Sequence, residues 1–119
     1  RRKEHYSKPA PQEMIEEMLS KEITPILLTT SPTCSAFTSR DFSYLQNIVQ
    51  IDKNLANHYD GVYLIDVREE LNKVIGSNCA NYFSDGYHIN PEGHNQFANI
   101  VVNQFTEWKN NNEGPFSCQ

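Results

Sequence analysis

The sequence lacks the features that mark several large functional classes. Its formal net charge is −5, so it has no basic excess with which to hold nucleic acid. It contains no apolar run that approaches the ~20 residues needed to span a membrane. No apolar segment follows the basic first residues, as a secretory signal would require. We therefore expect neither nucleic acid nor a membrane span among its interactions.

Cysteine and glycine are placed in ways that exclude further classes. Cys34, Cys79 and Cys118 are an odd set without Cys-x-x-Cys spacing, which argues against a zinc cage. The chain has no Gly-rich phosphate loop, so nucleotide chemistry has no support. The three thiols allow one disulfide with one thiol left over, or three reduced thiols. The compartment is therefore unknown, with a secreted or extracellular location slightly favoured.

What is present is an alternation of helical and strand patterns within 119 residues, enough for one domain at most. Apolar spacing predicts a helix from Pro11, a strand over 23–30, a helix over 41–59, a strand over 62–67, a helix over 68–75, a loop over 77–90 and a helix from Pro91 to about Lys109. Residues 1–10 and 110–119 are expected to be extended or frayed. Strands that alternate with helices pair in parallel.

The predicted strands indicate a fold that extends beyond this chain. The consecutive apolar residues Ile26, Leu27 and Leu28 predict a strand that is buried on both faces. Two strands alone cannot bury both faces of a sheet and protect its edges. We therefore predict an α/β fold, with residues 1–119 as the C-terminal half of a three-layer α/β/α domain. The last helix should turn an apolar stripe to the core, formed by Phe97, Val101, Phe105 and Trp108.

The segment before the last helix carries the candidate chemistry. Asp85 stands three residues before His88 with a glycine between them, ahead of a helix that Asn90 can cap. In open α/β sheets, sites gather at the carboxyl ends of the strands. A histidine there can take a proton from a serine hydroxyl, and a carboxylate on its other ring nitrogen fixes the tautomer. We therefore assign His88 as a candidate general base and Asp85 as its orienting acid.

The segment Asp85-Gly86-Tyr87-His88-Ile89-Asn90-Pro91-Glu92-Gly93-His94 resembles the last conserved block of the SGNH/GDSL hydrolases, a family of esterases and lipases. That block reads Asp-x-x-His, with Gly after the Asp and an Asn-Pro-x-Gly-like helix start. The order of elements also fits over about residues 11–108, although only the final block is specific. The resemblance implies a flavodoxin-like SGNH-hydrolase fold and a serine-dependent esterase. Its substrates would be acetylated carbohydrate or lipid-like esters, and it implies no metal and no organic cofactor.

The chain departs from the family where the nucleophile should be. It contains no Gly-Asp-Ser block, no oxyanion glycine and no Gly-x-Asn-Asp-like block. The resemblance therefore predicts that a separate N-terminal half or partner polypeptide supplies the serine and the oxyanion donors, and that this chain alone is inactive. One alternative is a binding or structural module that has kept the fold and lost catalysis. Another is a flavodoxin-like ligand binder in which the Asp/His block is a coincidence.

The serines near the predicted site have simpler interpretations. Ser31 follows the first strand but lacks the flanking glycines of a nucleophile elbow, so we interpret it as a loop serine that bonds local backbone. Ser84 adjoins Asp85 and would have to reach back across the same turn. Asp66 ends a strand and is expected to cap a helix. Two roles stay open, lining a substrate pocket or wedging the loop, for Tyr82, Phe83 and Tyr87.

Overall fold

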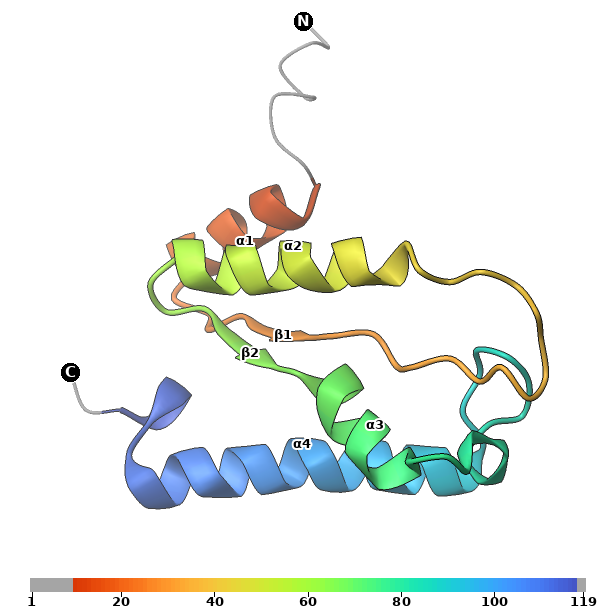
Figure 1. Ribbon diagram of the computed structural model, residues 1–119. Helices are drawn as coiled ribbons and strands as arrows, with labels where there is room; N and C mark the ends of the chain where they lie inside the picture. Colours follow the sequence, from red (N-terminus) through yellow and green to blue (C-terminus); the bar gives the residue numbers. More distant parts are fainter. Residues whose placement is uncertain (1–9, 118–119) are drawn as a thin grey trace, which may run out of the picture.

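The computed structural model describes residues 10–117, so the predicted lead-in over 1–9 and residues 118–119 lie outside the described part. Its main elements, in order, are α1 (Ala10–Ser20), β1 (Ile26–Leu28), α2 (Leu45–His58), β2 (Tyr63–Ile65), α3 (Val67–Ile75) and α4 (Pro91–Asn111). Two short 3₁₀ helices follow α3 and α4, η2 (Cys79–Asn81) and η3 (Gly114–Phe116). The predicted α/β class is confirmed (Figure 1).

The strands β1 and β2 pair in parallel and are joined through α2, as the alternation of patterns predicted. Leu27 lies opposite Leu64 in the middle of the pair. Each strand has three residues and is shorter than its predicted span. The pairing begins late because Pro25 has no backbone N–H to donate. It ends early because Asp66 already caps the next helix.

Helices lie on two sides of the strand pair. α1 and α2 lie on one side and α4 on the other, with α3 leading from β2 towards α4 (Figure 1). The expected burial of both strand faces is wrong for residues 10–117. Ile26 and Leu27 are half-buried, and 39% of Leu28 is exposed. The reason is that a sheet of two strands has open edges, and a pocket of about 450 Å³ separates β2 from α4.

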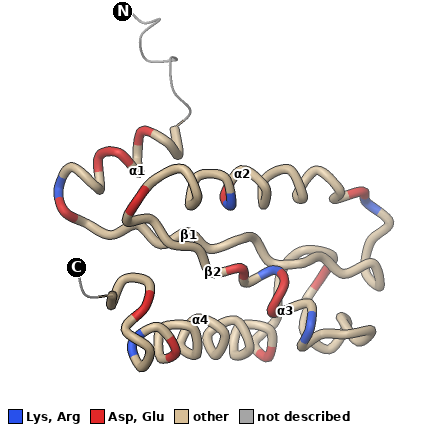
Figure 2. Tube along the Cα trace, turned by 60° about the vertical axis from the view of Figure 1, so that its left-hand side comes forward, with Lys and Arg blue, Asp and Glu red and all other residues tan. Residues whose placement is uncertain are grey.

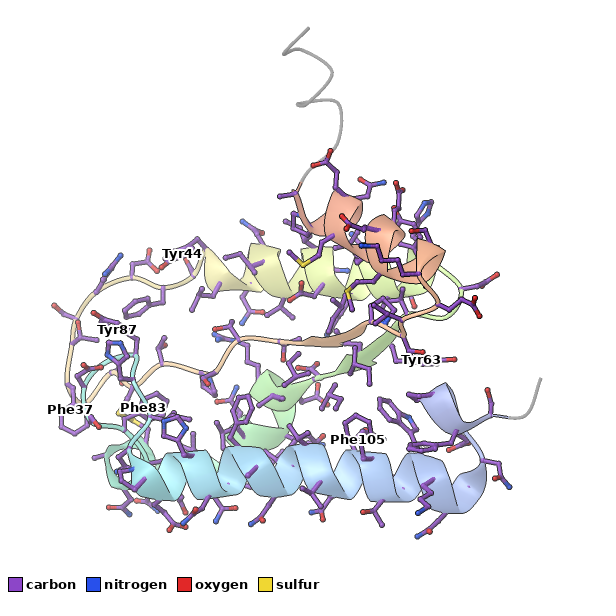
Figure 3. All side chains as sticks on the ribbon, turned by 180° about the vertical axis from the view of Figure 1, so that it is seen from behind. Phe37, Tyr44, Tyr63, Phe83, Tyr87 and Phe105 are labelled. Carbon is purple, nitrogen blue, oxygen red and sulfur yellow. A yellow bond between two sulfur atoms is a disulfide. The ribbon has the colours of Figure 1, made fainter. Side chains whose placement is uncertain are left out.

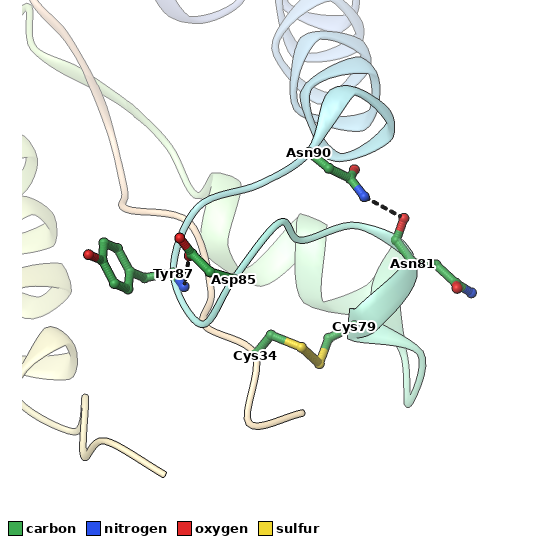
Figure 4. Close-up of a disulfide and its surroundings, with 6 residues drawn as sticks. All are labelled: Cys34, Cys79, Asn81, Asp85, Tyr87 and Asn90. Carbon is green, nitrogen blue, oxygen red and sulfur yellow. Dashed lines mark hydrogen bonds between the residues drawn. A yellow bond between two sulfur atoms is a disulfide. The ribbon is translucent and has the colours of Figure 1, made fainter. Parts of the chain in front are cut away.

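A buried apolar cluster lies beside the C-terminal half of α3. It is formed by Cys34, Leu71, Ile75 and Phe83. A disulfide joins Cys34 to Cys79, with a distance of 5.6 Å between their Cα atoms (Figure 4). This disulfide decides between the two thiol states left open by the sequence, while Cys118 lies outside the described residues. The loop after β1 is thereby fastened to the loop after α3.

The C-terminal segment corrects another expectation. Residues 110–117 are not frayed: α4 continues to Asn111, and Asn112 ends it in a left-handed conformation with φ of 53°. The chain then folds back so that the ring of Phe116 lies 6.3 Å from that of Phe105. These aromatic contacts hold the segment on α4. The predicted stripe of α4 is half-buried rather than fully enclosed, and its Trp108 ring lies 6.0 Å from Tyr63 of β2.

Within residues 10–117, no helix combines the length and apolar character needed to cross a membrane. Lys and Arg residues are scattered along the described trace, with acidic residues interspersed among them (Figure 2).

Candidate active site

Hydrogen bonds within the loop 77–90 and to the start of α4 hold this loop in one conformation. Asn90 caps α4, because its side-chain oxygen accepts a hydrogen bond from the Gly93 N–H at 2.9 Å. The same side chain donates to the Asn81 carbonyl at 3.0 Å (Figure 4). Inside the loop, the Ser84 N–H donates to the His88 carbonyl at 2.7 Å. Residues 84–88 therefore form a tight turn with a fixed entry and exit.

Gly86, at the centre of this turn, lies against the loop that follows β1. Its carbonyl accepts a hydrogen bond from the Cys34 N–H at 2.8 Å. A side chain at position 86 would overlap the side chain of Thr38. The glycine between the acid and the histidine is thus required by close approach of a second loop. The Cys34–Cys79 disulfide fastens that second loop in place.

The turn brings the two predicted site residues together. Asp85 Oδ2 lies 2.8 Å from His88 Nδ1. Asp85 Oδ1 accepts hydrogen bonds from the Tyr87 N–H at 2.9 Å and the His88 N–H at 2.7 Å. The Tyr87 N–H, the His88 ring and the His88 N–H together lower the pKa of Asp85 to about 2. Asp85 is therefore an anion at neutral pH.

A carboxylate at Nδ1 determines what the ring can do. The anionic Asp85 accepts a hydrogen bond, so Nδ1 of His88 must carry the proton. In the neutral imidazole the free lone pair then lies on Nε2, which can accept a proton from a reacting group. This division between an orienting side and a basic side of the ring is the one that hydroxyl activation requires.

His88 lies in the wall of an open pocket of about 300 Å³. The pocket is lined by Ser31, Tyr87, His88, Ile89, His94 and Phe97. The His88 side chain is 63% exposed, and the Tyr87 ring lies 4.2 Å from the imidazole. The aromatic residues of the loop divide between the two roles left open: Phe83 is buried in the cluster around the disulfide, whereas Tyr87 lines the pocket (Figure 3). Tyr82 packs against the same cluster as Phe83.

The part of the chain that the structure describes supplies a base and an acid but no hydroxyl bonded to them. Ser31 shares the pocket with His88, yet no hydrogen bond joins the two within residues 10–117. The backbone carbonyl of Ser31 accepts from Nη1 of Arg68 at 2.9 Å. Ser84 takes part in the turn through its backbone N–H, which donates to His88. Asp85 and His88 can therefore accept a proton, but no hydroxyl that could donate this proton is bonded to them within residues 10–117.

Asp66, which follows β2, has the helix-capping role predicted for it. Its Oδ1 accepts from the Glu69 N–H at 3.1 Å and from the Thr29 hydroxyl at 2.9 Å. Burial raises the pKa of Asp66, but these bonds and the charge of Lys53 outweigh burial and lower the pKa overall. Among residues 10–117, no group of three or more His, Cys, Asp or Glu side chains could hold a metal ion.

Arg68, Arg40 and Phe42 are close to this site and were not singled out from the sequence. Arg68 lies in the first turn of α3, where the helix dipole disfavours a positive charge. That unfavourable placement was the one available sign of a special role. Arg40 and Phe42 belong to the loop before α2, which begins at Leu45 and not at residue 41 as predicted. Phe42 was therefore interpreted as part of the helix, and nothing in the sequence singles out Arg40.

Comparison of the chain with family models, with curated proteins and with solved structures finds no match. The likeness to SGNH/GDSL hydrolases therefore stands on the residues of the final block and the order of elements alone.

Proposed function

We propose that the chain is the base-carrying part of a serine esterase that resembles the SGNH/GDSL hydrolases. The observation that carries the proposal is the 2.8 Å contact between Asp85 Oδ2 and His88 Nδ1, which leaves Nε2 as the basic nitrogen beside an open pocket. Substrates would be carboxylic esters, with acetylated carbohydrate or lipid-like esters implied by the resemblance. No metal or organic cofactor is required by this chemistry.

The reaction would proceed through an acyl-serine. His88 Nε2 accepts the serine proton as the serine oxygen attacks the ester carbonyl carbon. The imidazolium then returns this proton to the alcohol oxygen as the carbon–oxygen bond of the ester breaks. Water repeats the sequence on the acyl-serine and releases the acid. Asp85 stays ionised throughout and stabilises the imidazolium, as its pKa of about 2 allows.

The serine and the oxyanion donors would come from a segment or partner polypeptide outside residues 10–117, which would complete a three-layer, flavodoxin-like domain. Three features of the chain support this. The outer edges of β1 and β2 are unpaired within residues 10–117, and Leu28 is partly exposed. The radius of gyration is 16.6 Å, whereas a compact domain of this length has about 13 Å. Further strands beside this pair would bury these groups.

Substitution of His88 in the complete assembly tests the proposal. His88→Ala removes the base, and kcat/KM for an activated ester should fall by about 10²–10⁴-fold. Asp85→Asn keeps the imidazole but loses the anion that fixes its tautomer and stabilises the imidazolium, so turnover should also fall by orders of magnitude. His58→Ala is the matched control, because it makes the same substitution at an exposed histidine of α2 that does not line the pocket. Ester turnover unchanged by His88→Ala, or lowered equally by His58→Ala, eliminates the assignment.

One observation favours the alternative of an inactive binding or structural module. No hydroxyl among residues 10–117 is hydrogen-bonded to His88, so catalysis depends wholly on a group from elsewhere. A serine-directed phosphonate probe separates the two possibilities. Covalent labelling of a chain or segment associated with this one, abolished by His88→Ala, supports the esterase. Absence of labelling in the complete assembly supports the module.

A further inference from the structure

A second pocket lies next to the candidate active site, where the loop before α2 meets the start of α3. Its volume is about 230 Å³. The lining is dominated by hydroxyl and guanidinium groups, from Thr33, Cys34, Ser35, Thr38, Arg40, Asp41, Phe42, Ser43 and Arg68. This composition differs from that of the His88 pocket, whose exposed lining is mostly apolar.

Arg68 forms one cationic wall of this pocket, and the described residues use only part of its hydrogen-bonding capacity. Nη1 donates to the Ser31 carbonyl at 2.9 Å. Nε is buried and has no hydrogen-bond partner within residues 10–117. A guanidinium has five N–H donors, and a buried donor without a partner is uncommon. Burial lowers the pKa of Arg68, against the opposing effect of the Asp66 charge, yet the guanidinium stays protonated.

Arg40 forms a second cationic wall. Its guanidinium lies 5.1 Å from the centre of the Phe42 ring, a cation–π contact that holds the side chain over the loop. The acidic residue of the lining is Asp41, whose Oδ1 accepts the Ser43 N–H at 2.8 Å. Within the pocket lining, two guanidinium groups therefore face one carboxylate, in a chain whose net charge is −5. The charge of Asp66, which also acts on Arg68 from outside the lining, is balanced by Lys53, whose Nζ lies 3.4 Å from Asp66 Oδ2. The local excess of positive charge suits an anion.

The two pockets share their walls. The Phe42 ring lines the pocket with the two arginines and lies 5.9 Å from the Tyr87 ring, which lines the other pocket beside His88. On a second side, Ser31 lines the His88 pocket while its carbonyl accepts from Arg68. A molecule whose reacting group lies at His88 could therefore extend past Tyr87 towards the arginines.

We propose that the pocket lined by Arg40 and Arg68 binds a small oxyanion group, a carboxylate, sulfate or phosphate. This group would be a substituent of the molecule that occupies the His88 pocket. On the proposed function, on which this second step rests, the substrate is an ester that carries an acidic substituent on the part next to Tyr87. Both guanidiniums would bond its oxygens, and the hydroxyls of Thr33 and Ser35 would supply further donors.

Binding of the oxyanion is tested without reference to catalysis. The full chain is titrated with sodium sulfate at constant ionic strength, and NMR follows its arginine Nε–Hε signals and the amides of 33–43. Saturable shifts are expected, and Arg40→Gln should weaken sulfate binding by about tenfold or more, the loss expected for one charged donor. Lys21→Gln is the control: it makes the same charge change at an exposed residue of the segment after α1. Linear shifts, or equal weakening by both variants, overturn the proposal.

Ester turnover by the complete assembly tests the link between the pockets. An ester with a carboxylate or sulfate substituent should have a higher kcat/KM than its neutral counterpart, and Arg40→Gln should remove that preference. Ser35→Ala, a milder change at an exposed residue, should reduce it partly. If sulfate binds but both esters react equally in the parent protein, the anion is a separate ligand and the substrate proposal fails. If neither ester reacts while sulfate still binds, the esterase proposal fails and the anion pocket stands.

Discussion

The loops at the carboxyl end of the strand pair are held by many contacts within residues 10–117, whereas the strands themselves are held by few. At the carboxyl end, a disulfide, a buried apolar cluster and backbone bonds fix the turn that holds Asp85 and His88. Along the strands, each edge residue has one neighbouring strand and Leu28 is partly exposed. The site therefore takes its geometry from contacts within residues 10–117, whereas these residues leave the outer strand edges unpaired and Leu28 partly exposed.

The largest expected effect comes from removal of the disulfide. Cys34→Ala with Cys79→Ala opens a loop with a sequence separation of 45 residues. In the loop-entropy account this costs about 4 kcal/mol of unfolding free energy. Amide hydrogen exchange should show that protection falls first over 77–90, because this loop loses its covalent tie. Cys118→Ala is the control and should leave this loop unchanged. Equal amide protection of residues 77–90 with and without the disulfide would contradict the claim that the disulfide fixes this loop.

A smaller effect is expected from a matched pair of leucine truncations. Leu71 is fully buried in the apolar cluster, so Leu71→Ala should lower the unfolding free energy by about 3 kcal/mol. Leu28 is 39% exposed, so Leu28→Ala should lower the unfolding free energy of this chain by only about 1 kcal/mol, because Leu28 buries less apolar surface on folding than Leu71 does. Chemical denaturation of both variants measures the difference. In a complete assembly with further strands, Leu28→Ala should lower the unfolding free energy by nearly as much as Leu71→Ala does. A loss of unfolding free energy that stays at about 1 kcal/mol would refute the presence of further strands that bury Leu28.

The smallest effect concerns the acid of the site. His88→Ala removes one of the hydrogen bonds that lower the pKa of Asp85, so this pKa should rise from about 2 but stay below 3.8, because the Tyr87 N–H remains. A folded pKa below the ordinary value stabilises the fold above pH 3.8 and loses this contribution as the pH falls towards about 2. Carboxyl ¹³C NMR titration measures the shift. An unchanged pKa would mean that the ring does not bond to Asp85.

Much of the helical framework could be predicted from local signals. Asn90 and Pro91 mark the start of α4, Gly76 ends α3 with φ of 56°, and Asp66 caps α3 as expected. The Asp85–His88 contact was also predictable, because it is made within one turn. These features depend on neighbours a few residues away, which a sequence displays directly.

Features formed by distant segments were less accessible. One disulfide with a thiol left over was one of two open states, and sequence spacing alone did not show that Cys34 pairs with Cys79. The fold-back of Phe116 onto Phe105 was missed because an Asn-rich segment resembles a frayed end. The burial predicted for β1 is wrong for residues 10–117, because an apolar run does not show what covers a strand, and here Leu28 stays 39% exposed.

The central claim is that Nε2 of His88 takes the proton of a serine hydroxyl, and chemical rescue tests it most directly. Because the His88 side chain is 63% exposed, imidazole from solution can enter the space left by His88→Gly. In the complete assembly, added imidazole should restore ester turnover of this variant in a saturable way, above the background reaction of imidazole with the ester. Rescue should fail in a variant that also lacks the serine. Turnover by His88→Gly that equals the parent without imidazole would contradict the account.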